Sequence, residues 1–417
     1  MAGWNGSGTF VRLYNWVADK AASVKIIASR MDGEFDNYKT GLENCLTRDG
    51  QNSPSANVSW NSKKITSLAN GTASTDAANY GQITGVTTGN AFRKNMLANG
   101  GFDVWQSGAG GSASITGTAS RIRTADCWWA VRAASATGYT VSQQTGESSR
   151  YALKWQRTAA NAATDVMYLA QSLETQDCVW LKRGTPPTLY LSFKAKKGAN
   201  YSGGDLSALV IRGTGTDECV LDTFTGATTL ATLTQTLTAS LVKYSLAVPC
   251  DASTNQIGVR FAWTPTGAAG ADDSITLEEV QLEYASAATD FERLPFADTL
   301  ARCMRYYIKT FPYGTAPAQS AGDSSVLHWV CAAAGAVTQG AFSYPFPVPF
   351  RASPTATTYN PSAANAHVRN LSVAGDHSST IATVYSPLGL AVQSIGNAGG
   401  AAGNTLSVHL TAADANF

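Results

Sequence analysis

The sequence predicts a mainly β protein with a helical, coiled N-terminal segment, a central antiparallel jelly-roll sandwich and a small C-terminal β domain. Between residues 95 and 295, many short segments of alternating apolar residues are separated by turn residues, as in double-sheet β folds. The 417 residues include 38 glycines and only 14% charged residues, which is a turn-rich and weakly charged composition. We expect domains over residues 1–95, 96–295 and 296–417.

The N-terminal segment differs because its apolar residues follow a heptad, the period of a coiled seam. Gly33 and Gly41 each weaken a helix by about 1 kcal/mol relative to alanine, so we do not expect an uninterrupted rod. Two interpretations stay open: one amphipathic helix packed on its own domain, or a three-helix seam between copies of the chain. The heptad positions are Val17, Ala21, Val24, Ala28, Met31, Phe35, Tyr38 and Leu42, followed by Cys45.

Short phrases after the heptad indicate turns and one further helix. Asp49-Gly50 and Asn70-Gly71 are turn pairs, and Thr75 or Asp76 can cap a short helix that runs to Gln82. In their order, the phrases in residues 10–85 resemble the virion-proximal region of podophage-type tail fibres. The resemblance implies a small helix-containing domain that fastens a fibre to the phage tail, and it favours the three-helix seam.

The central region opens with a glycine-marked turn and an alternating strand over Asn99–Gln106 and continues with the Trp-rich segment Ala125–Ala130. Its closing strand has Val280, Leu282 and Tyr284 on one face. We expect further strands at 138–144, 151–157, 166–172, 188–196, 206–212, 219–224, 241–248, 256–263 and 275–284.

These opening, Trp-rich and closing segments resemble the jelly-roll domain of many bacteriophage and prophage tail fibres. Cys127 is a departure, because the family often has a basic residue there. The resemblance implies a carbohydrate-binding-like sandwich joined to a distal β domain, and a function in host adsorption.

Residues 300–417 carry very little charge and alternate proline with apolar residues over Tyr344–Arg351. Prolines cannot donate to a central ladder, so this segment is expected to be an edge strand or an extended segment. Apolar edges aggregate unless they are covered, and intertwining with two further copies would cover them. We therefore expect a homotrimeric fibre. The charged residues are Arg302, Arg305, Lys309, Asp323, Arg351, Arg369, Asp376 and Asp414.

Composition and motifs argue against several classes of function. A formal net charge of +1 gives no basic groove for nucleic acid. The seven cysteines form no C-x-x-C pair and are expected as buried free thiols. The start lacks a basic stretch followed by an apolar core, so we expect a virion protein made in a bacterial cytoplasm without a signal peptide.

Motifs for catalysis and for cofactor binding are absent from the sequence, so we expect neither an enzyme nor a cofactor. All four histidines lie at or after residue 328 and none is spaced for a metal. A structural calcium ion held by loop carbonyls and an aspartate of the jelly roll stays open.

A polysaccharide depolymerase is the alternative from the enzyme class, and a structural virion adaptor is another. A glycosidase needs two carboxyl groups roughly 5–9.5 Å apart. Glu279 and Glu283 share a strand face, but four residues of strand put their backbones about 13 Å apart. We expect them on a solvated face.

Sugar binding requires an aromatic ring for the apolar face of the sugar and polar groups for its hydroxyls. Most aromatic residues of the sandwich are expected in its core, whereas those in the distal region lie beside glycine, proline or serine. The expected partners are bacterial cell-surface glycan or an outer-membrane protein, a phage tail or adaptor protein for the N-terminal region, and two further copies of the chain. The candidate receptor-binding residues are Tyr313, Trp329, Tyr344, Tyr359 and Tyr385.

Overall fold

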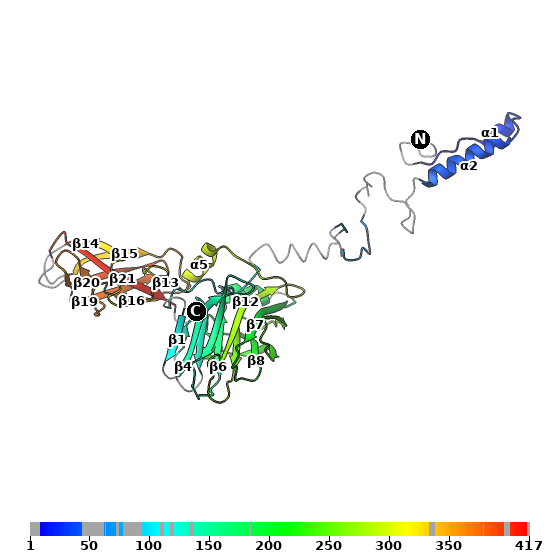
Figure 1. The fold of residues 1–417 in the computed structure, drawn as a ribbon. Helices are drawn as coiled ribbons and strands as arrows, with labels where there is room; N and C mark the ends of the chain where they lie inside the picture. The colour runs from blue at the N-terminus through cyan, green and yellow to red at the C-terminus, as the bar shows by residue number, and fades with distance from the viewer. Residues whose placement is uncertain are drawn as a thin grey trace. The chain divides into compact units, whose positions relative to one another are not determined.

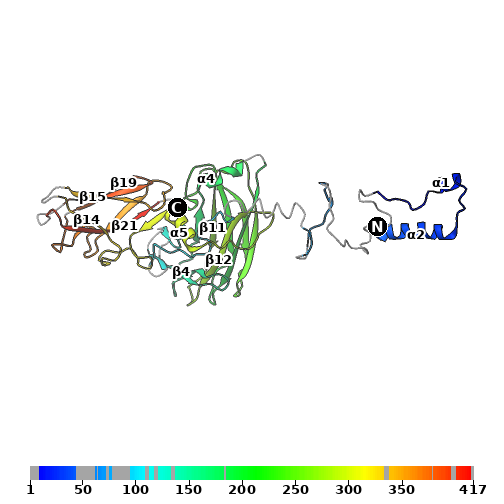
Figure 2. The same ribbon diagram turned by 90° about the horizontal axis from the view of Figure 1, so that it is seen from above.

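The computed structural model describes residues 9–43, 62, 64–71, 75–77, 94–108, 112–116, 121–132, 137–182, 185–332, 338–377, 379–395 and 401–414. The chain divides into two compact units, Met1–Asn79 and Tyr80–Phe417 (Figures 1 and 2). Three predicted features lie outside the described residues: Cys45, the turn pair Asp49-Gly50 and most of the short helix expected up to Gln82. Among the described helices, none is both long and apolar enough to span a membrane.

The N-terminal unit contains two helices, α1 (Trp16–Ala21) and α2 (Ala28–Glu43). The Asn15 side chain caps α1 by accepting hydrogen bonds from the amides of Val17 and Ala18. The heptad therefore does not run along one helix, because Val24 lies between the two. The interruption that we expected at the glycines of α2 instead occurs before that helix begins.

An extended N-terminal segment packs along α2 through polar contacts. The buried carboxylate of Glu34 accepts hydrogen bonds from the amides of Leu13 and Tyr14, and the Asn37 amide donates to the carbonyl of Val11. Phe10 lies across Gly41, where a Cβ would come within 2.1 Å of the Phe10 ring. The glycine that weakens the helix is thus the residue that lets this aromatic ring pack on it.

The second unit contains the predicted antiparallel jelly-roll sandwich, whose two sheets have six strands each. Figure 1 shows several of these strands side by side. The first sheet has the order β1 (Ser112–Thr116), β4 (Thr137–Thr145), β5 (Tyr151–Arg157), β12 (Ser274–Tyr284), β7 (Thr188–Lys197) and β10 (Val242–Pro249). The second has the order β2 (Ile122–Arg123), β3 (Trp129–Arg132), β6 (Met167–Ser172), β11 (Gln256–Trp263), β8 (Leu206–Gly213) and β9 (Thr228–Gln235).

The core of the sandwich follows from the alternation of apolar residues along these strands. On β7, every second residue from Leu189 to Ala195 is buried, and on β11 the same holds from Ile257 to Trp263. Trp155 on β5 meets Trp263 edge to face, with 5.8 Å between ring centroids. Burial of these large rings supplies much of the apolar area that holds the two sheets together.

Four details of the sandwich differ from the sequence expectations. Residues 219–224 form a 3₁₀ turn, Val220–Asp222, instead of a strand, and β9 was not expected. The glycine-marked turn at Gly100-Gly101 is present, but no strand follows it up to Gln106. Asn99 and Phe102 have φ of 51° and 57°, and the Asn99 side chain bonds the backbone of Val104. The Trp-rich strand begins only at Trp129, since Cys127 also has a positive φ.

The C-terminal part of this unit has its own smaller core. Strand β21 (Thr405–Ala413) is central and pairs with β13 (Tyr307–Lys309), β14 (Leu327–Val330), β16 (Thr355–Tyr359) and β17 (Arg369–Asn370), and β17 pairs with β18 (Gly375–Asp376). A three-stranded sheet has the order β15 (Thr338–Pro345), β20 (Gly389–Ile395) and β19 (Ser379–Ser386). Of the proline-rich segment Tyr344–Arg351, only Tyr344 and Pro345 belong to a strand, at the end of the edge strand β15, and the rest follows outside the sheet.

A helix and an ion-pair network connect the C-terminal part to the sandwich. Helix α5 (Phe296–Met304) follows β12, and the shorter α4 (Thr175–Cys178) and 3₁₀ helix η1 (Val179–Lys182) follow β6. Arg305 donates two hydrogen bonds to the buried Glu174, which also accepts from the Tyr306 hydroxyl. These charge-assisted contacts are among the strongest hydrogen bonds in proteins, and they join β13 to the end of β6.

A completely buried ion pair inside the sandwich gives a test of the fold. Arg157 and Asp273 are both 0% exposed and lie 2.7 Å apart. Replacing Arg157 with methionine would leave the Asp273 charge buried without its partner, so we expect the free energy of unfolding to fall by about 3–5 kcal/mol. Urea unfolding followed by tryptophan fluorescence measures this change.

The matched control is Lys154→Met on the same strand, because Lys154 pairs with Asp272 at the surface. We expect a loss of at most about 1 kcal/mol for this variant. Equal losses for the two variants would contradict the structural role assigned to Arg157.

Candidate functional site

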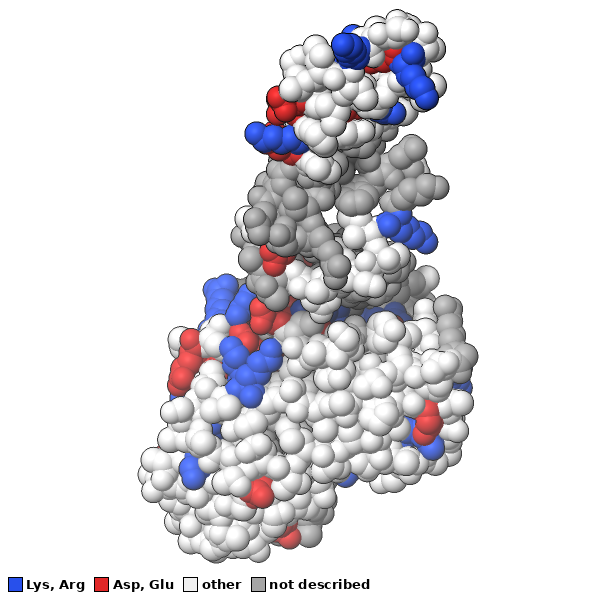
Figure 3. Space-filling model, turned by 90° about the vertical axis from the view of Figure 1, so that its right-hand side faces the viewer, with Lys and Arg blue, Asp and Glu red and all other residues white. Residues whose placement is uncertain are grey.

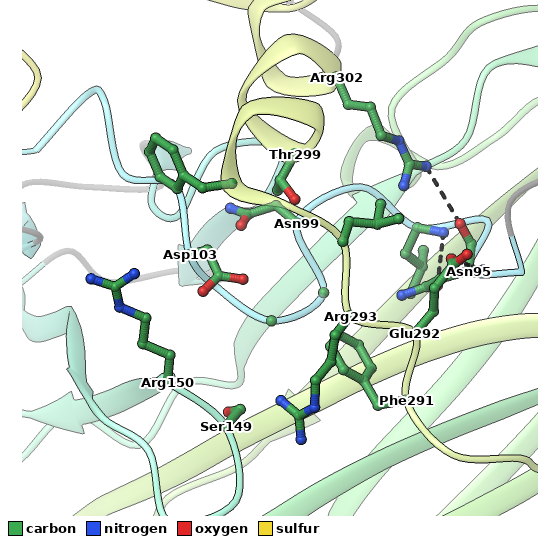
Figure 4. Close-up of a pocket in the computed structure, with 15 residues that line it drawn as sticks. Asn95, Asn99, Asp103, Ser149, Arg150, Phe291, Glu292, Arg293, Thr299 and Arg302 are labelled. Carbon is green, nitrogen blue, oxygen red and sulfur yellow. Dashed lines mark hydrogen bonds between the residues drawn. The ribbon is translucent and has the colours of Figure 1, made fainter.

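The second unit has a pocket of about 220 Å³ at the end of the sandwich beside α5. Figure 4 shows its lining residues projecting from separate parts of the chain toward a common hollow. They come from the turn Asn99–Asp103, the loop between β4 and β5, the segment after β12, and α5. The full lining is Asn95, Leu97, Asn99, Gly100, Gly101, Asp103, Ser149, Arg150, Phe291, Glu292, Arg293, Leu294, Phe296, Thr299 and Arg302.

A β-bulge in β12 positions these segments. Glu278 lies opposite Lys194 of β7 and Gln281 lies opposite Ser192, so two residues of β12 face one residue of its neighbour. Glu279, inside the bulge, has a φ of 53°, which is uncommon for a residue with a side chain. The bulge shifts the alternation of β12 by one residue, so that Ile275 and Leu277 before the bulge and Val280 after it all face the core.

The first two bulge residues hold two walls of the pocket. The Glu278 carboxylate accepts hydrogen bonds from the amides of Glu147, Ser148 and Ser149 in the β4–β5 loop. Burial acts to raise the pKa of Glu278, but these hydrogen bonds outweigh it and the pKa is lowered. Glu279 pairs with Arg293 at 2.5 Å and with Lys194 at 2.8 Å.

The next two bulge residues hold the floor and the remaining wall. The Val280 amide donates to the Gly100 carbonyl, and a Cβ on Gly100 would lie 2.0 Å from the Val280 oxygen. Only glycine allows this close approach between the turn and the strand. The Gln281 side chain accepts from the Glu292 amide, and the Glu292 carboxylate in turn accepts from the amides of Lys94 and Asn95.

Two charged side chains at the pocket have unused hydrogen-bonding capacity. Within the part of the chain that the structure describes, the Asp103 carboxylate and the Arg150 guanidinium make no hydrogen bond; the Arg150 group lies over the Tyr151 ring. Burial raises the pKa of Asp103, while the positive charges of Arg150 and Arg293 act against this rise. Asp103 is therefore a half-buried acceptor that faces the hollow, with Arg150 and Arg293 nearby (Figure 4).

The pocket also has aromatic groups. Phe296, the first residue of α5, is 44% exposed, and its ring meets the Tyr313 ring edge to face. The Phe291 ring lies against Gly101, where a Cβ would come within 3.5 Å of it. The pocket therefore combines an exposed phenyl ring with a carboxylate and a guanidinium, which are the groups that bind a partly apolar ligand rich in hydroxyls.

The pocket carries no strong net charge. Among the lining residues, the guanidinium groups of Arg150, Arg293 and Arg302 are opposed by the carboxylates of Asp103 and Glu292. Glu279, outside the lining, pairs with Arg293. On the molecular face shown in Figure 3, charged side chains of both signs are scattered among uncharged residues. Among the described residues, no group of three or more His, Cys, Asp and Glu side chains could hold a metal ion.

The expectation that Glu279 and Glu283 lie on a solvated face of β12 is wrong. Glu279 is 7% exposed and Glu283 is 0% exposed. Glu283 accepts hydrogen bonds from the Thr289 amide and hydroxyl, so the chain after β12 returns over the outer face of this strand and covers it. The sequence pattern could not show this cover, because it comes from a segment without periodicity.

The predicted receptor-binding residues do not form one site. Tyr313 is 41% exposed, but its hydroxyl accepts from the Trp105 amide and donates to the Asp103 carbonyl. Trp329 and Tyr344 pack against the smaller core, where they meet Phe342 and Phe346 respectively. Tyr359 packs against Phe311, and the side chain of Tyr385 lies outside the described residues.

The residues that line the pocket were missed by the sequence analysis. Asp103 was assigned to a strand, and neither Arg150 nor Phe296 belongs to a motif. The turn at Gly100-Gly101 was expected, but not that these glycines allow a close backbone approach that shapes a pocket. The convergence of the other residues depends on the bulge and on α5, which the sequence did not predict.

No family model matches the chain, and no curated protein matches it. Solved structures with a similar fold include the enzymatically active domain of tailspike protein 4 from bacteriophage CBA120, with 12% identity and a TM-score of 0.27. That match covers 46% of this chain and 21% of the tailspike chain, so the chain spans only a small part of that protein.

Other similar structures are carbohydrate-binding modules. A xylan-binding CBM22-1 domain from Paenibacillus barcinonensis has 16% identity and a TM-score of 0.27, covering 43% of this chain and 98% of the module. TmCBM61, solved with β-1,4-galactotriose, has 12% identity and a TM-score of 0.26, covering 46% of this chain and 99% of the module. Matches at this level do not assign a ligand or a binding site to this chain.

The contacts of Tyr313 predict a structural role for its hydroxyl. We expect Tyr313→Phe to lower the free energy of unfolding by about 1–3 kcal/mol, because the amide of the buried Trp105 loses its acceptor. The unfolding midpoint in urea measures the change. Tyr359→Phe is the control, since the Tyr359 hydroxyl makes no hydrogen bond within the described residues; it should leave stability unchanged. Unaltered stability of Tyr313→Phe would contradict this role.

Proposed function

We propose that this protein is a non-enzymatic, homotrimeric bacteriophage tail fibre that binds a bacterial cell surface. Its N-terminal unit attaches to a tail or adaptor protein of the virion, and its β unit contacts surface glycan, with an outer-membrane protein as the other receptor class. The protein is made in the host cytoplasm and functions in the virion. The proposal draws on the sequence resemblance to tail fibres, and one structural observation carries it further.

That observation is an exposed apolar stripe on α2. Met31, Phe35, Tyr38 and Leu42 follow a 4-3-4 spacing and, at 3.6 residues per turn, lie within an arc of about 60°. Phe35 is 61% exposed and Leu42 is 69% exposed. The unit's own packing mainly uses a neighbouring face of the helix, through Glu34, Asn37 and Gly41, and on the stripe itself Phe10 stacks on Tyr38.

Such a stripe is costly to leave in water and has the spacing of a coiled-coil seam. Two further copies of α2 would cover the stripe with the same residues. The stripe is two heptad positions wide, which is the width that such a seam uses. Val17, Ala21 and Val24 do not extend this stripe, because they precede the start of α2. We therefore place the seam on the α2 positions alone.

The contacts of the acidic residues support a non-enzymatic protein. The carboxylates of Glu279 and Glu283 are both engaged in ion pairs or hydrogen bonds that hold the β12 region together. His409 stacks on Phe311 with 4.0 Å between ring centroids, and its Nε2 lies 3.0 Å from the Gly322 carbonyl. Each of these groups thus has a structural partner.

The seam is tested by charge substitution on α2. We expect the full-length protein to have the mass of three chains in light scattering, and Met31→Asp with Phe35→Asp to reduce it to one chain, because buried unpaired carboxylates would face each other at the seam. The control is Ser29→Asp with Lys39→Asp, which places two carboxylates off the stripe and should leave the trimer intact. A monomeric wild-type protein would contradict the proposal.

The receptor function is tested with immobilised bacterial surface polysaccharides. We expect the full-length protein to adsorb to at least one polysaccharide without releasing reducing ends, and the trimer to be retained more strongly than the Met31→Asp, Phe35→Asp variant because three sites raise the effective affinity. Release of reducing ends would favour the depolymerase instead. Adsorption to virion proteins but to no bacterial surface would favour the structural adaptor.

A further inference from the structure

We propose that the pocket beside α5 binds one ring of a neutral saccharide, with Asp103 and Arg150 bonding its hydroxyl groups and Phe296 covering its apolar face. The inference rests on the proposed function, because it names the ligand class and the site through which the β unit contacts a glycan. It places that site at the end of the sandwich and not at the aromatic residues predicted farther along the chain.

The size of the pocket limits the ligand. Its volume of about 220 Å³ is below the roughly 300–1,000 Å³ of pockets for drug-sized ligands. It can enclose a single sugar ring, while the neighbouring rings of a glycan extend outside. A long groove for several consecutive rings is not what this geometry provides.

The two polar groups match a pair of adjacent hydroxyls. A carboxylate only accepts hydrogen bonds and a guanidinium only donates them, whereas a hydroxyl does both. Two neighbouring hydroxyls can therefore donate to Asp103 and accept from Arg150 at the same time. Asp103 is already partly desolvated, and its carboxylate has no hydrogen-bond partner within the described residues. A ligand that supplies donors therefore replaces the hydrogen bonds to water that burial removed.

The charge of the pocket selects a neutral ligand. Arg293 is held by Glu279 at 2.5 Å and also donates to the Ser148 carbonyl. Arg302 donates to the carbonyls of Asn95 and Met96. Each of these two side chains bonds through one guanidinium nitrogen, whereas the Arg150 guanidinium makes no hydrogen bond within the described residues. Asp103 stands close enough to interact with the charge of Arg150, so an anion would meet a carboxylate as well as a cation.

The aromatic group at the pocket supplies the apolar contact. Phe296 is 44% exposed, whereas the large rings of the sandwich core, such as Trp128 and Trp155, are fully buried. A phenyl ring presents an apolar face to the C–H groups of a sugar. Its position at the start of α5 holds the ring in place, because the helix is anchored through Arg302 to the backbone before the glycine turn.

The experiment is a titration of the full-length protein, followed by saturation-transfer NMR and calorimetry. The probes are the methyl glycosides of glucose, galactose, mannose and N-acetylglucosamine, with glucuronate and inorganic phosphate as anionic probes. A ligand of this size should bind with a dissociation constant of about 1 mM. We expect at least one neutral glycoside to bind and both anions to bind more weakly.

Substitutions locate the binding. Asp103→Asn keeps the shape of the side chain and removes its charge. We expect this variant to bind the glycoside at least about tenfold more weakly. Phe296→Ala and Arg150→Gln should weaken it as well, and Arg150 is exposed, so its replacement does not disturb the fold. The controls are Asp323→Asn and Leu388→Ala, at exposed positions in the C-terminal part, which should bind as the wild type does.

Four results would overturn the inference: binding of none of the neutral glycosides, preference for an anionic probe, wild-type affinity in Asp103→Asn, or equal losses in the control variants. Its failure is distinct from failure of the proposed function. If Asp103→Asn still adsorbs to a bacterial polysaccharide like the wild type, the proposed saccharide site is wrong and the tail-fibre proposal is unaffected. If the wild type binds a glycoside but is a monomer, the trimeric tail-fibre proposal is wrong and the proposed saccharide site is unaffected.

Discussion

The bulge in β12 is the constraint on which the functional end of this protein depends. Four consecutive residues, Glu278 to Gln281, each hold a different segment: the β4–β5 loop, Arg293, the Gly100 turn and the backbone of Glu292. A regular strand would direct alternate side chains into the core and could not make all four contacts. The extra residue lets the Val280 amide leave the ladder and donate to the Gly100 carbonyl at the point where the pocket forms.

Charge in this part of the molecule is sparse but concentrated at joints. Arg305 and Tyr306 both bond the buried Glu174, and Arg351 pairs with Asp217 and Asp414. These contacts join the C-terminal strands to the sandwich. A pocket at such a joint has walls from several elements that are each fixed independently, which is how a small site keeps its shape without a ligand.

The N-terminal unit has the opposite arrangement from a usual amphipathic helix. Polar Glu34 and Asn37 are buried on α2 by the extended segment, whereas Phe35 and Leu42 are exposed. The Glu34 carboxylate accepts hydrogen bonds from the amides of Leu13 and Tyr14, and Asn37 donates to the Val11 carbonyl, so the extended segment supplies partners for this polar face. On the apolar stripe, Phe10 stacks on Tyr38, whereas Phe35 and Leu42 are more than half exposed; the proposed self-association depends on this contrast.

Period-two alternation by itself determined the sandwich and most of its strands, because burial of one face of a strand leaves a direct trace in the sequence. The heptad likewise located α2 but not the break before it. The site was decided only by the tertiary structure. Asp103, Arg150 and Phe296 carry no shared pattern and meet because a bulge, a glycine turn and α5 bring them together. Contacts between distant segments leave no local period, so no reading of the chain alone could have assembled them.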